Sequence, residues 1–257
     1  MAKTTTQKHK RADQYDDPDH NYLDYWNGRD YEHNAEMLAL KRLLKGKHFK
    51  LAVDVGGGYG RLDPLLAQFA DTVILAEPSK QQLQIAENFL AGKENIIARQ
   101  LQADDLKFQT GEVDLVTCIR VMHHLPHPEA ELAEMHRILA TDGYAVIEMA
   151  NYLHAQNRLK HALHGQRFGE EPVDIRSAAH RKESEIPFVN HNPYTFMKQL
   201  EATGFRIEAI LSVSNLRNPT LKKILPLGLM LAAEKSMQRP LANSFFGPST
   251  FFLLRKA

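Results

Sequence analysis

Four glycines crowd into five positions of this sequence, at Gly56, Gly57, Gly58 and Gly60. They follow residues 51–55, a short apolar run typical of a β-strand. Because glycine has no Cβ, a strand that runs into such a loop can turn sharply and bring backbone N–H groups against a ligand. The sequence therefore predicts a ligand cradle at residues 56–60.

The spacing of these glycines separates two classes of cofactor. The dinucleotide fingerprint G-x-G-x-x-G requires a glycine at position 61, where this chain has Arg61. Instead, Asp54 stands two positions before three alternating glycines. This arrangement resembles the first motif, D/E-x-G-x-G-x-G, of the class I S-adenosylmethionine (SAM) dependent methyltransferases. The resemblance implies that Asp54 and the four glycines contact SAM.

An acidic residue closes the next predicted strand. Residues 72–76 are apolar and partly β-branched, and Glu77 and Pro78 follow them. In a doubly wound sheet, an acidic side chain at the end of the second strand lies beside the ligand crevice and can accept hydrogen bonds from both ribose hydroxyls. We expect Glu77 to bind the cofactor ribose, with Pro78 beside it.

A third segment follows the predicted strand at residues 96–101. Relatives place the sequence D-A-x-x-L-P-F here, and residues 102–108 of this chain read QADDLKF. Gln102 takes the aspartate position and Lys107 the proline position. The resemblance implies that the backbone N–H of Ala103 contacts adenine. Either Gln102 or Asp104 then accepts from the adenine amino group.

The fourth segment spans residues 113–149. A buried-strand pattern that ends at Ile119 is followed by His123 and His124, a helix-period stretch and a further strand. This order is similar to the corresponding segment of small-molecule methyltransferases, with Asp142 where a glycine is commoner. The resemblance covers roughly residues 50–150 and adds Ile119 to the expected cofactor contacts.

His123 and His124 are the candidate catalytic residues. Histidine titrates at about pH 6.5, and this loop would lie directly under the methyl group that is transferred. In the family that the chain resembles, the paired histidines also commonly shape the pocket, so both roles stay open. We expect no metal site with His127, because Pro126 and Pro128 interrupt a helix there and no cysteine pair completes a zinc set.

Composition limits the class of protein. A chain of 257 residues with 43% hydrophobic residues can bury one α/β core, and a net charge of +1 gives no general attraction to nucleic acid. The single cysteine, Cys118, lies in an apolar pattern and is expected to be a buried structural thiol. Without a signal-peptide pattern or a long apolar run, we expect a cytoplasmic protein with no membrane span.

The alternation of strands and helices predicts an α/β, Rossmann-like, doubly wound sheet of seven mostly parallel strands. Residues 205–213 and 250–254 would complete it with an antiparallel C-terminal edge strand, as the resemblance implies. We expect a disordered basic tail over residues 1–12 and a single domain over 13–257, with its core at 50–150.

Three segments outside the core are expected to shape the acceptor side. The first is N-terminal, with a helix predicted over residues 32–44 and these candidate substrate contacts: Tyr22, Tyr25, Trp26 and Arg29. The second is residues 165–190, which we interpret either as a lid over the substrate or as a surface insertion. The third is residues 215–245, which we interpret either as a lid or as part of the core packing. Residues 221–233 are apolar with two lysines, a pattern that fits a pocket cover or a membrane surface.

The leading hypothesis is a SAM-dependent methyltransferase that acts on a small molecule, such as an aromatic, isoprenoid or lipid-like acceptor, and releases S-adenosylhomocysteine. Two alternatives stay open: a SAM-binding protein without methyl transfer, and a nicotinamide-dependent oxidoreductase, which Arg61 disfavours. The chain lacks the Asn-Pro-Pro-Tyr type of motif found in many base methyltransferases, so no nucleic-acid partner is expected. The sequence leaves the oligomeric state open.

Overall fold

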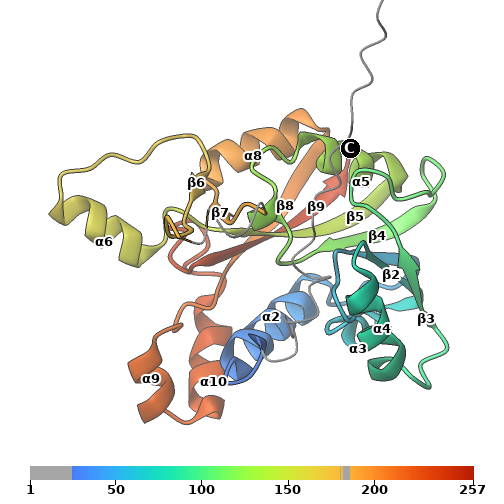
Figure 1. The fold of residues 1–257 in the computed structure, drawn as a ribbon, viewed down its shortest axis with the longest axis horizontal. Coiled ribbons are helices and arrows are strands. Elements are labelled where there is room, and N and C mark those ends of the chain that lie inside the picture. Colours follow the sequence, from blue (N-terminus) through green and yellow to red (C-terminus); the bar gives the residue numbers. More distant parts are fainter. Residues whose placement is uncertain (1–24, 180, 182–185) are drawn as a thin grey trace, which may run out of the picture.

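The computed structural model describes residues 25–179, 181 and 186–257. The predicted tail at residues 1–12 and the candidate Tyr22 lie outside this part. A seven-stranded sheet forms the centre of the molecule (Figure 1). Its strands are β1 (Phe49–Val55), β2 (Ala70–Glu77), β3 (Ile96–Gln100), β4 (Val113–Cys118), β5 (Leu139–Ala150), β8 (Phe205–Val213) and β9 (Ser249–Lys256).

The strand order is β3-β2-β1-β4-β5-β9-β8. The five strands from β3 to β5 pair in parallel, whereas β9 runs antiparallel to both β5 and β8. This topology confirms the predicted fold class. Because parallel strands end at one edge of a sheet, the carboxyl ends of β1, β2 and β4 converge there, as a ligand site requires.

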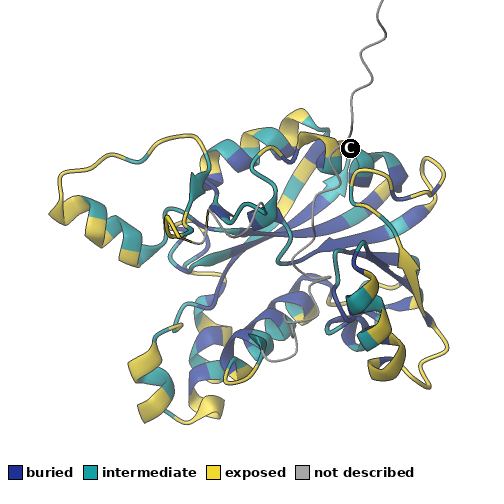
Figure 2. Ribbon diagram, in the orientation of Figure 1, coloured by how far each residue is buried: buried dark blue, intermediate teal, exposed yellow. Residues whose placement is uncertain are grey.

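Helices cover both faces of this sheet, in a three-layer arrangement (Figure 2). Side chains alternate along each strand. Ala52 therefore packs in the cluster under α2 (Asp30–Leu43), α3 (Asp63–Leu66) and α4 (Lys80–Phe89), while Val53 packs under α5 (Glu129–Ile138) and α8 (Pro193–Ala202). No helix in the described ranges is both long and apolar enough to cross a bilayer. The remaining elements are η2 (Met122–His124), α6 (Ala155–Leu163), β6 (Val173–Asp174), β7 (Val189–Asn190), α9 (Pro219–Ile224) and α10 (Leu227–Met237).

Asp142 stands at a position of β5 where the family more commonly has a glycine. Its φ is 63°, in the left-handed region that glycine adopts without strain and that aspartate tolerates better than most residues. Its carboxylate lies 2.8 Å from the guanidinium of Arg255 on β9. The departure from the family pattern therefore keeps the backbone conformation that a glycine would give.

The segment at residues 215–245 is fixed to α2 by a buried polar contact. The Tyr31 hydroxyl donates to Glu234 Oε2 (2.6 Å) on α10 and accepts from the Leu216 N–H (2.9 Å). The second oxygen of the Glu234 carboxylate accepts from the Ser214 N–H (2.9 Å). Tyr31 and Glu234 are 1% and 0% exposed, so all these polar groups depend on one another for hydrogen bonds.

We expect Tyr31→Phe to destabilise the fold. It removes the hydroxyl that donates to the buried Glu234 carboxylate and accepts from the Leu216 N–H, at a cost of about 2 kcal/mol, which corresponds to about 4–8 °C in Tm. The control is Tyr194→Phe, because the side chain of Tyr194 is 57% exposed. Thermal unfolding followed by circular dichroism measures both; equal Tm values for the two variants would contradict the structural role of Tyr31.

Candidate functional site

The glycine-rich loop at residues 56–60 leaves the carboxyl end of β1. Gly57 has no room for a side chain, because a Cβ atom would lie 2.5 Å from both Asp54 Oδ2 and Leu75 Cδ1. Gly58 has a φ of 63°, where any residue with a Cβ is strained. The loop therefore presents bare backbone at the end of two adjacent strands, which is the cradle geometry that the sequence predicts.

Glu77 at the end of β2 is tied to this loop. Its Oε2 accepts from the Gly58 N–H and its Oε1 from the Ser79 N–H, both at 2.9 Å. The side chain is 5% exposed. These two bonds orient the carboxylate, and each carboxylate oxygen has capacity for more than one hydrogen bond, as binding a ribose would require. The carbonyl oxygen of Pro78 accepts from Gln100 Nε2 (2.9 Å), which fixes the same turn.

Two buried carboxyl groups lie beneath the loop. Asp54 is 1% exposed, and its Oδ1 accepts from Thr117 Oγ1 (2.5 Å) on β4. Asp63 at the start of α3 is 0% exposed. Burial raises the pKa of Asp54, and burial together with the Asp54 carboxylate raises that of Asp63 well above its usual range. The protonated form of Asp63 is therefore favoured, and in that form it can donate to Asp54, because two buried like charges repel each other.

The candidate adenine contacts lie on a tight turn after β3. The Asp105 N–H donates to the Gln102 carbonyl (3.0 Å), and the side chains of Gln102 and Asp104 are both exposed. Lys107, at the family's proline position, has a φ of 58°, which proline cannot adopt. The turn thus differs in backbone conformation from one that contains the proline, and the adenine contact stays a prediction for either Gln102 or Asp104.

The two candidate catalytic histidines stack against each other on η2, with ring centroids 4.0 Å apart. Phe188 packs on His123, and His124 Nδ1 lies 3.0 Å from the Pro187 carbonyl oxygen. A carbonyl only accepts, so Nδ1 carries the proton and the basic lone pair of His124 is on Nε2. Burial lowers the pKa of both histidines, that of His123 strongly, and Arg120 contributes to the shift of His123.

At the end of β4, Ile119 is buried and Arg120 has a φ of 63°. A non-glycine residue in this region indicates backbone strain, which is commonly found at functional sites. The Arg120 N–H donates to Glu148 Oε2 (3.0 Å), and Ser249 Oγ donates to Glu148 Oε1 (2.5 Å). Burial raises the pKa of Glu148, so the contacts from Arg120 and Ser249 offset an unfavourable environment for this carboxylate.

Three of the four candidate substrate residues are brought to the glycine loop. The guanidinium of Arg61 lies 3.6 Å from the ring centroid of Trp26, and that of Arg29 lies 3.7 Å from the centroid of Tyr25. Arg120 reaches the same pair: its Nη1 donates to the Tyr25 hydroxyl (3.3 Å). One face of each ring is therefore already covered by a guanidinium, which reduces the surface available for a cation–π contact with a bound sulfonium.

The residue that joins this cluster, Glu36 on α2, was not among the predicted site residues. Its carboxylate accepts from Arg61 Nη2 (2.5 Å) and Arg120 Nε (2.8 Å). Burial alone would raise its pKa, but the two arginines outweigh that effect and lower it. Arg61 stood out in the sequence only because it replaces a glycine, and neither Glu36 nor Arg120 belongs to a sequence motif.

The burial of Cys118 follows the prediction made from the sequence. Cys118 is fully buried, and burial raises the pKa of its thiol well above the usual range, as for an inert structural cysteine. Among residues 25–179, 181 and 186–257, no three His, Cys, Asp or Glu side chains are placed to share a metal ion.

The profile of a methyltransferase-domain family matches residues 17–210. The chain belongs to this family. Its fold recurs in a Listeria monocytogenes protein assigned to the SAM-dependent methyltransferases, with a TM-score of 0.63, 14% identity and coverage of 88% of this chain and 99% of that one. It also recurs in the [4+2]-cyclase SpnF, with a TM-score of 0.57, 14% identity and coverage of 86% and 81%.

Among curated sequences, a ubiquinone biosynthesis O-methyltransferase from Methylococcus capsulatus is 32% identical over 102 residues, which are 39% of this chain and 43% of that protein. A Dictyostelium discoideum methyltransferase-like protein is 28% identical over 149 residues, or 56% and 53% of the two chains. The chain thus spans about half the length, or less, of the curated relatives that it matches. The matched region contains the family's class I core, and SAM is the cofactor that this family uses.

The residues of the methyltransferase domain fit SAM on two structural observations. The loop at 56–60 has positive φ at Gly56, Gly58 and Gly60, so its backbone N–H groups can approach a ligand without a side chain in the way. Nearby, Trp26 Nε1 is buried with no hydrogen-bond partner among the described residues, and a polar ligand group would satisfy it. The individual binding roles of Asp54, Glu77, Gln102 and the other candidates stay predictions.

The buried acid pair predicts an unusual pH dependence. A carboxyl group whose pKa is raised on folding contributes its stability at low pH and loses it as the pH rises through the raised pKa. Asp63→Asn should keep the donor to Asp54 without titrating. We therefore expect this variant to exceed the wild type in Tm by a few degrees near neutral pH, where about 1 kcal/mol corresponds to about 2–4 °C.

The difference in Tm should shrink toward about pH 4, where an ordinary aspartate also becomes protonated. Asp105→Asn is the matched control, because Asp105 pairs with Lys107 on the surface. Thermal unfolding over this pH range measures the effect. A Tm difference between Asp63→Asn and wild type that does not change with pH would rule out the shared proton.

Proposed function

We propose that this protein binds SAM and transfers its methyl group to a small-molecule acceptor. The observation that carries the proposal is the glycine loop fixed to Glu77 at the carboxyl edge of the sheet, with the Tyr25–Trp26 cluster directly beside it. Family membership supports the same reaction class. The identity of the acceptor is proposed only as a class, aromatic, isoprenoid or lipid-like.

Different residues of the chain would bind different parts of the cofactor and the acceptor. Backbone N–H groups of residues 56–60 approach the cofactor, and Glu77 accepts from its ribose hydroxyls. Ile119 and the backbone of Ala103 contact the adenine ring. Tyr25, Trp26 and Arg29 lie on the acceptor side with the two histidines, and Phe188 from the 165–190 segment covers His123.

Bound SAM would supply a methyl group that its sulfonium already activates. The protein then needs chiefly to hold the acceptor atom in line behind that methyl, and orientation of this kind can supply about 7–11 kcal/mol. His123 and His124 are neutral near pH 7 because burial lowers the pKa of each. Neutral imidazoles can accept a hydrogen bond from an acceptor hydroxyl and orient it, although such weak bases remove a proton less readily.

The fold alone does not determine the reaction, since the [4+2]-cyclase SpnF shares it. Binding and transfer are therefore tested separately. Calorimetry with SAM, S-adenosylhomocysteine and NAD tests the cofactor, and a screen of phenolic, prenylated and amine acceptors with methyl-labelled SAM tests transfer. Binding of NAD without SAM would overturn the proposal. Tight SAM binding with no label transferred to any acceptor would favour a SAM-binding protein of another kind.

Glu77→Gln is expected to weaken SAM binding. A carboxylate accepts through both of its oxygens, whereas the glutamine amide accepts through one oxygen and donates through its NH₂ group. The variant therefore loses a contact with the ribose and the hydrogen bond from the Gly58 N–H. A loss of about 1.5–3 kcal/mol corresponds to about 10- to 150-fold in Kd. Glu87→Gln, on the exposed side of α4, is the control. Calorimetry that gives the two variants the same Kd would remove Glu77 from the site.

The adenine contact can be assigned by a reciprocal pair of variants. If Gln102 has the family's aspartate role, Gln102→Ala weakens SAM binding by about tenfold, the effect of one lost hydrogen bond, and Asp104→Ala leaves it unchanged. The opposite pattern assigns the contact to Asp104. Both side chains are exposed, so neither variant should alter the fold. If neither changes the Kd for SAM, adenine does not bind at this turn.

A further inference from the structure

The turn between α9 and α10 exposes large apolar side chains. Ile224, Leu227 and Leu229 are 70%, 39% and 58% exposed, and we call these three residues the apolar tip. Within residues 223–229, only Leu225 is partly buried. Core packing therefore does not account for the apolar sequence here.

A second apolar projection lies at the same end of the molecule. α6 contains no buried residue, and Leu159 and Leu163, one turn apart, are 64% and 76% exposed. Figure 1 shows α6 and α9 both projecting at the left end, and Figure 2 shows them coloured as exposed or intermediate. The starts of α6 and α9 lie within electrostatic reach of each other. Burial lowers the pKa of His154, which precedes α6, and the positive charge of Arg217, just before α9, lowers it further.

Basic residues outnumber acidic ones around both projections. Residues 155–169 contain three basic side chains and no acid, and residues 217–239 contain a single acid, Glu234, which is fully buried. The chain as a whole has a net charge of only +1, so positive charge is concentrated here. The basic residues are Arg158, Lys160, Arg167, Arg217, Lys222, Lys223, Lys235 and Arg239.

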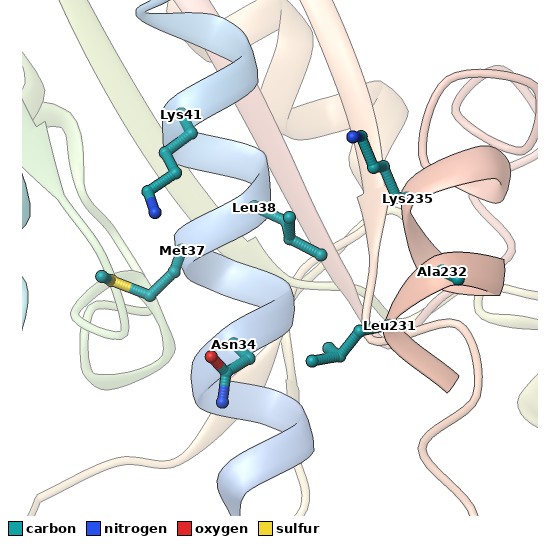
Figure 3. A pocket seen from close by; sticks show the side chains of 7 residues that line it. All are labelled: Asn34, Met37, Leu38, Lys41, Leu231, Ala232 and Lys235. Atoms are coloured by element: carbon teal, nitrogen blue, oxygen red, sulfur yellow. The ribbon is translucent and has the colours of Figure 1, made fainter. Parts of the chain in front are cut away.

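A shallow groove between α2 and α10 continues this surface. It has a volume of about 230 Å³. Leu231, one turn after Leu227 of the tip, faces Leu38 of α2 across it, with Lys41 and Lys235 toward one end (Figure 3). An apolar floor with two lysines suits an amphiphile that has a negative head group.

The tip has a fixed position relative to the candidate site. Glu32 on α2 binds Lys222 Nζ (2.9 Å) of α9, and Glu36, one helical turn away, is held by Arg61 and Arg120. Residues four apart lie on one face of a helix, about 6 Å apart along its axis. A surface bound by the tip would therefore lie close to the acceptor side of the site.

We propose that the apolar tip and α6 dock this protein onto the surface of an anionic lipid bilayer. Exposed aliphatic side chains among lysines and arginines are the pattern of elements that lie in a membrane interface. The apolar side chains enter the boundary between head groups and acyl chains, and the basic ones bind anionic head groups. This inference concerns binding only and holds whether or not the chain transfers a methyl group.

Vesicle flotation with the full chain tests the proposal. We expect binding to phosphatidylcholine vesicles that contain about 30% phosphatidylglycerol, and at least about tenfold weaker binding to phosphatidylcholine alone. Raising the salt from about 0.1 M to about 0.5 M should weaken the binding, because salt screens the attraction between the basic side chains and the anionic head groups. Failure to float with the anionic vesicles at low salt overturns the proposal.

Paired variants locate the surface. The double variant Ile224→Ser, Leu229→Ser should weaken vesicle binding by about tenfold or more, and Lys223→Glu by about fivefold or more. The controls make the same changes at other exposed positions: Ile97→Ser on β3, where the side chain is 43% exposed, and Lys93→Glu. Equal losses in variants and controls would place the binding elsewhere and overturn the proposal.

Other occupants of this surface give different results. If a second copy of the chain covers the tip, light scattering shows a dimer that Ile224→Ser, Leu229→Ser dissociates, which contradicts the membrane proposal. Because the altered side chains are exposed, thermal unfolding should give wild-type Tm values for the variants. SAM affinity measured on the same samples separates a loss of docking from a fault in the cofactor site.

Discussion

One buried carboxylate links the parts of the molecule that surround the candidate site. Glu36 of α2 is 2% exposed and binds both Arg61, directly after the glycine loop, and Arg120, at the end of β4. Taking three charges out of water costs several kcal/mol for each ion, and only close pairing offsets that cost. Each member therefore needs the other two. The helix that precedes the core is in this way fixed to the two loops that would hold cofactor and acceptor.

The same helix face continues the coupling away from the sheet. Glu32, one turn from Glu36, pairs with Lys222 and lies 3.7 Å from Arg217. Two buried carboxylates on one face of a helix are unfavourable unless basic groups pair with them. Here Arg61 and Arg120 pair with Glu36, and Lys222 pairs with Glu32. α2 thus connects the glycine loop on one side with α9 and the exposed tip on the other.

Local patterns allowed much of the fold and part of the site to be predicted. The glycine loop, the acidic end of β2 and the histidine turn are read from consecutive residues, and a parallel sheet brings strand ends together whatever else surrounds them. The Glu36 cluster could not be read in this way, because its members are far apart in sequence and pair through side chains of ordinary composition. The contact of Arg61 with the ring of Trp26 was missed for the same reason, and it covers one face of that ring.

Electrostatics at the end of β4 bears on how a methyl acceptor would be activated. The charge of Arg120 adds to burial in lowering the pKa of His123, so this region disfavours added protons. The same positive potential would lower the pKa of an acidic hydroxyl bound there, because it stabilises the anion that forms. Among the described residues, Glu36 binds both Arg61 and Arg120. If the chain transfers a methyl group as proposed, the Arg120 guanidinium would stabilise a phenolic or enolic oxygen anion of a bound acceptor.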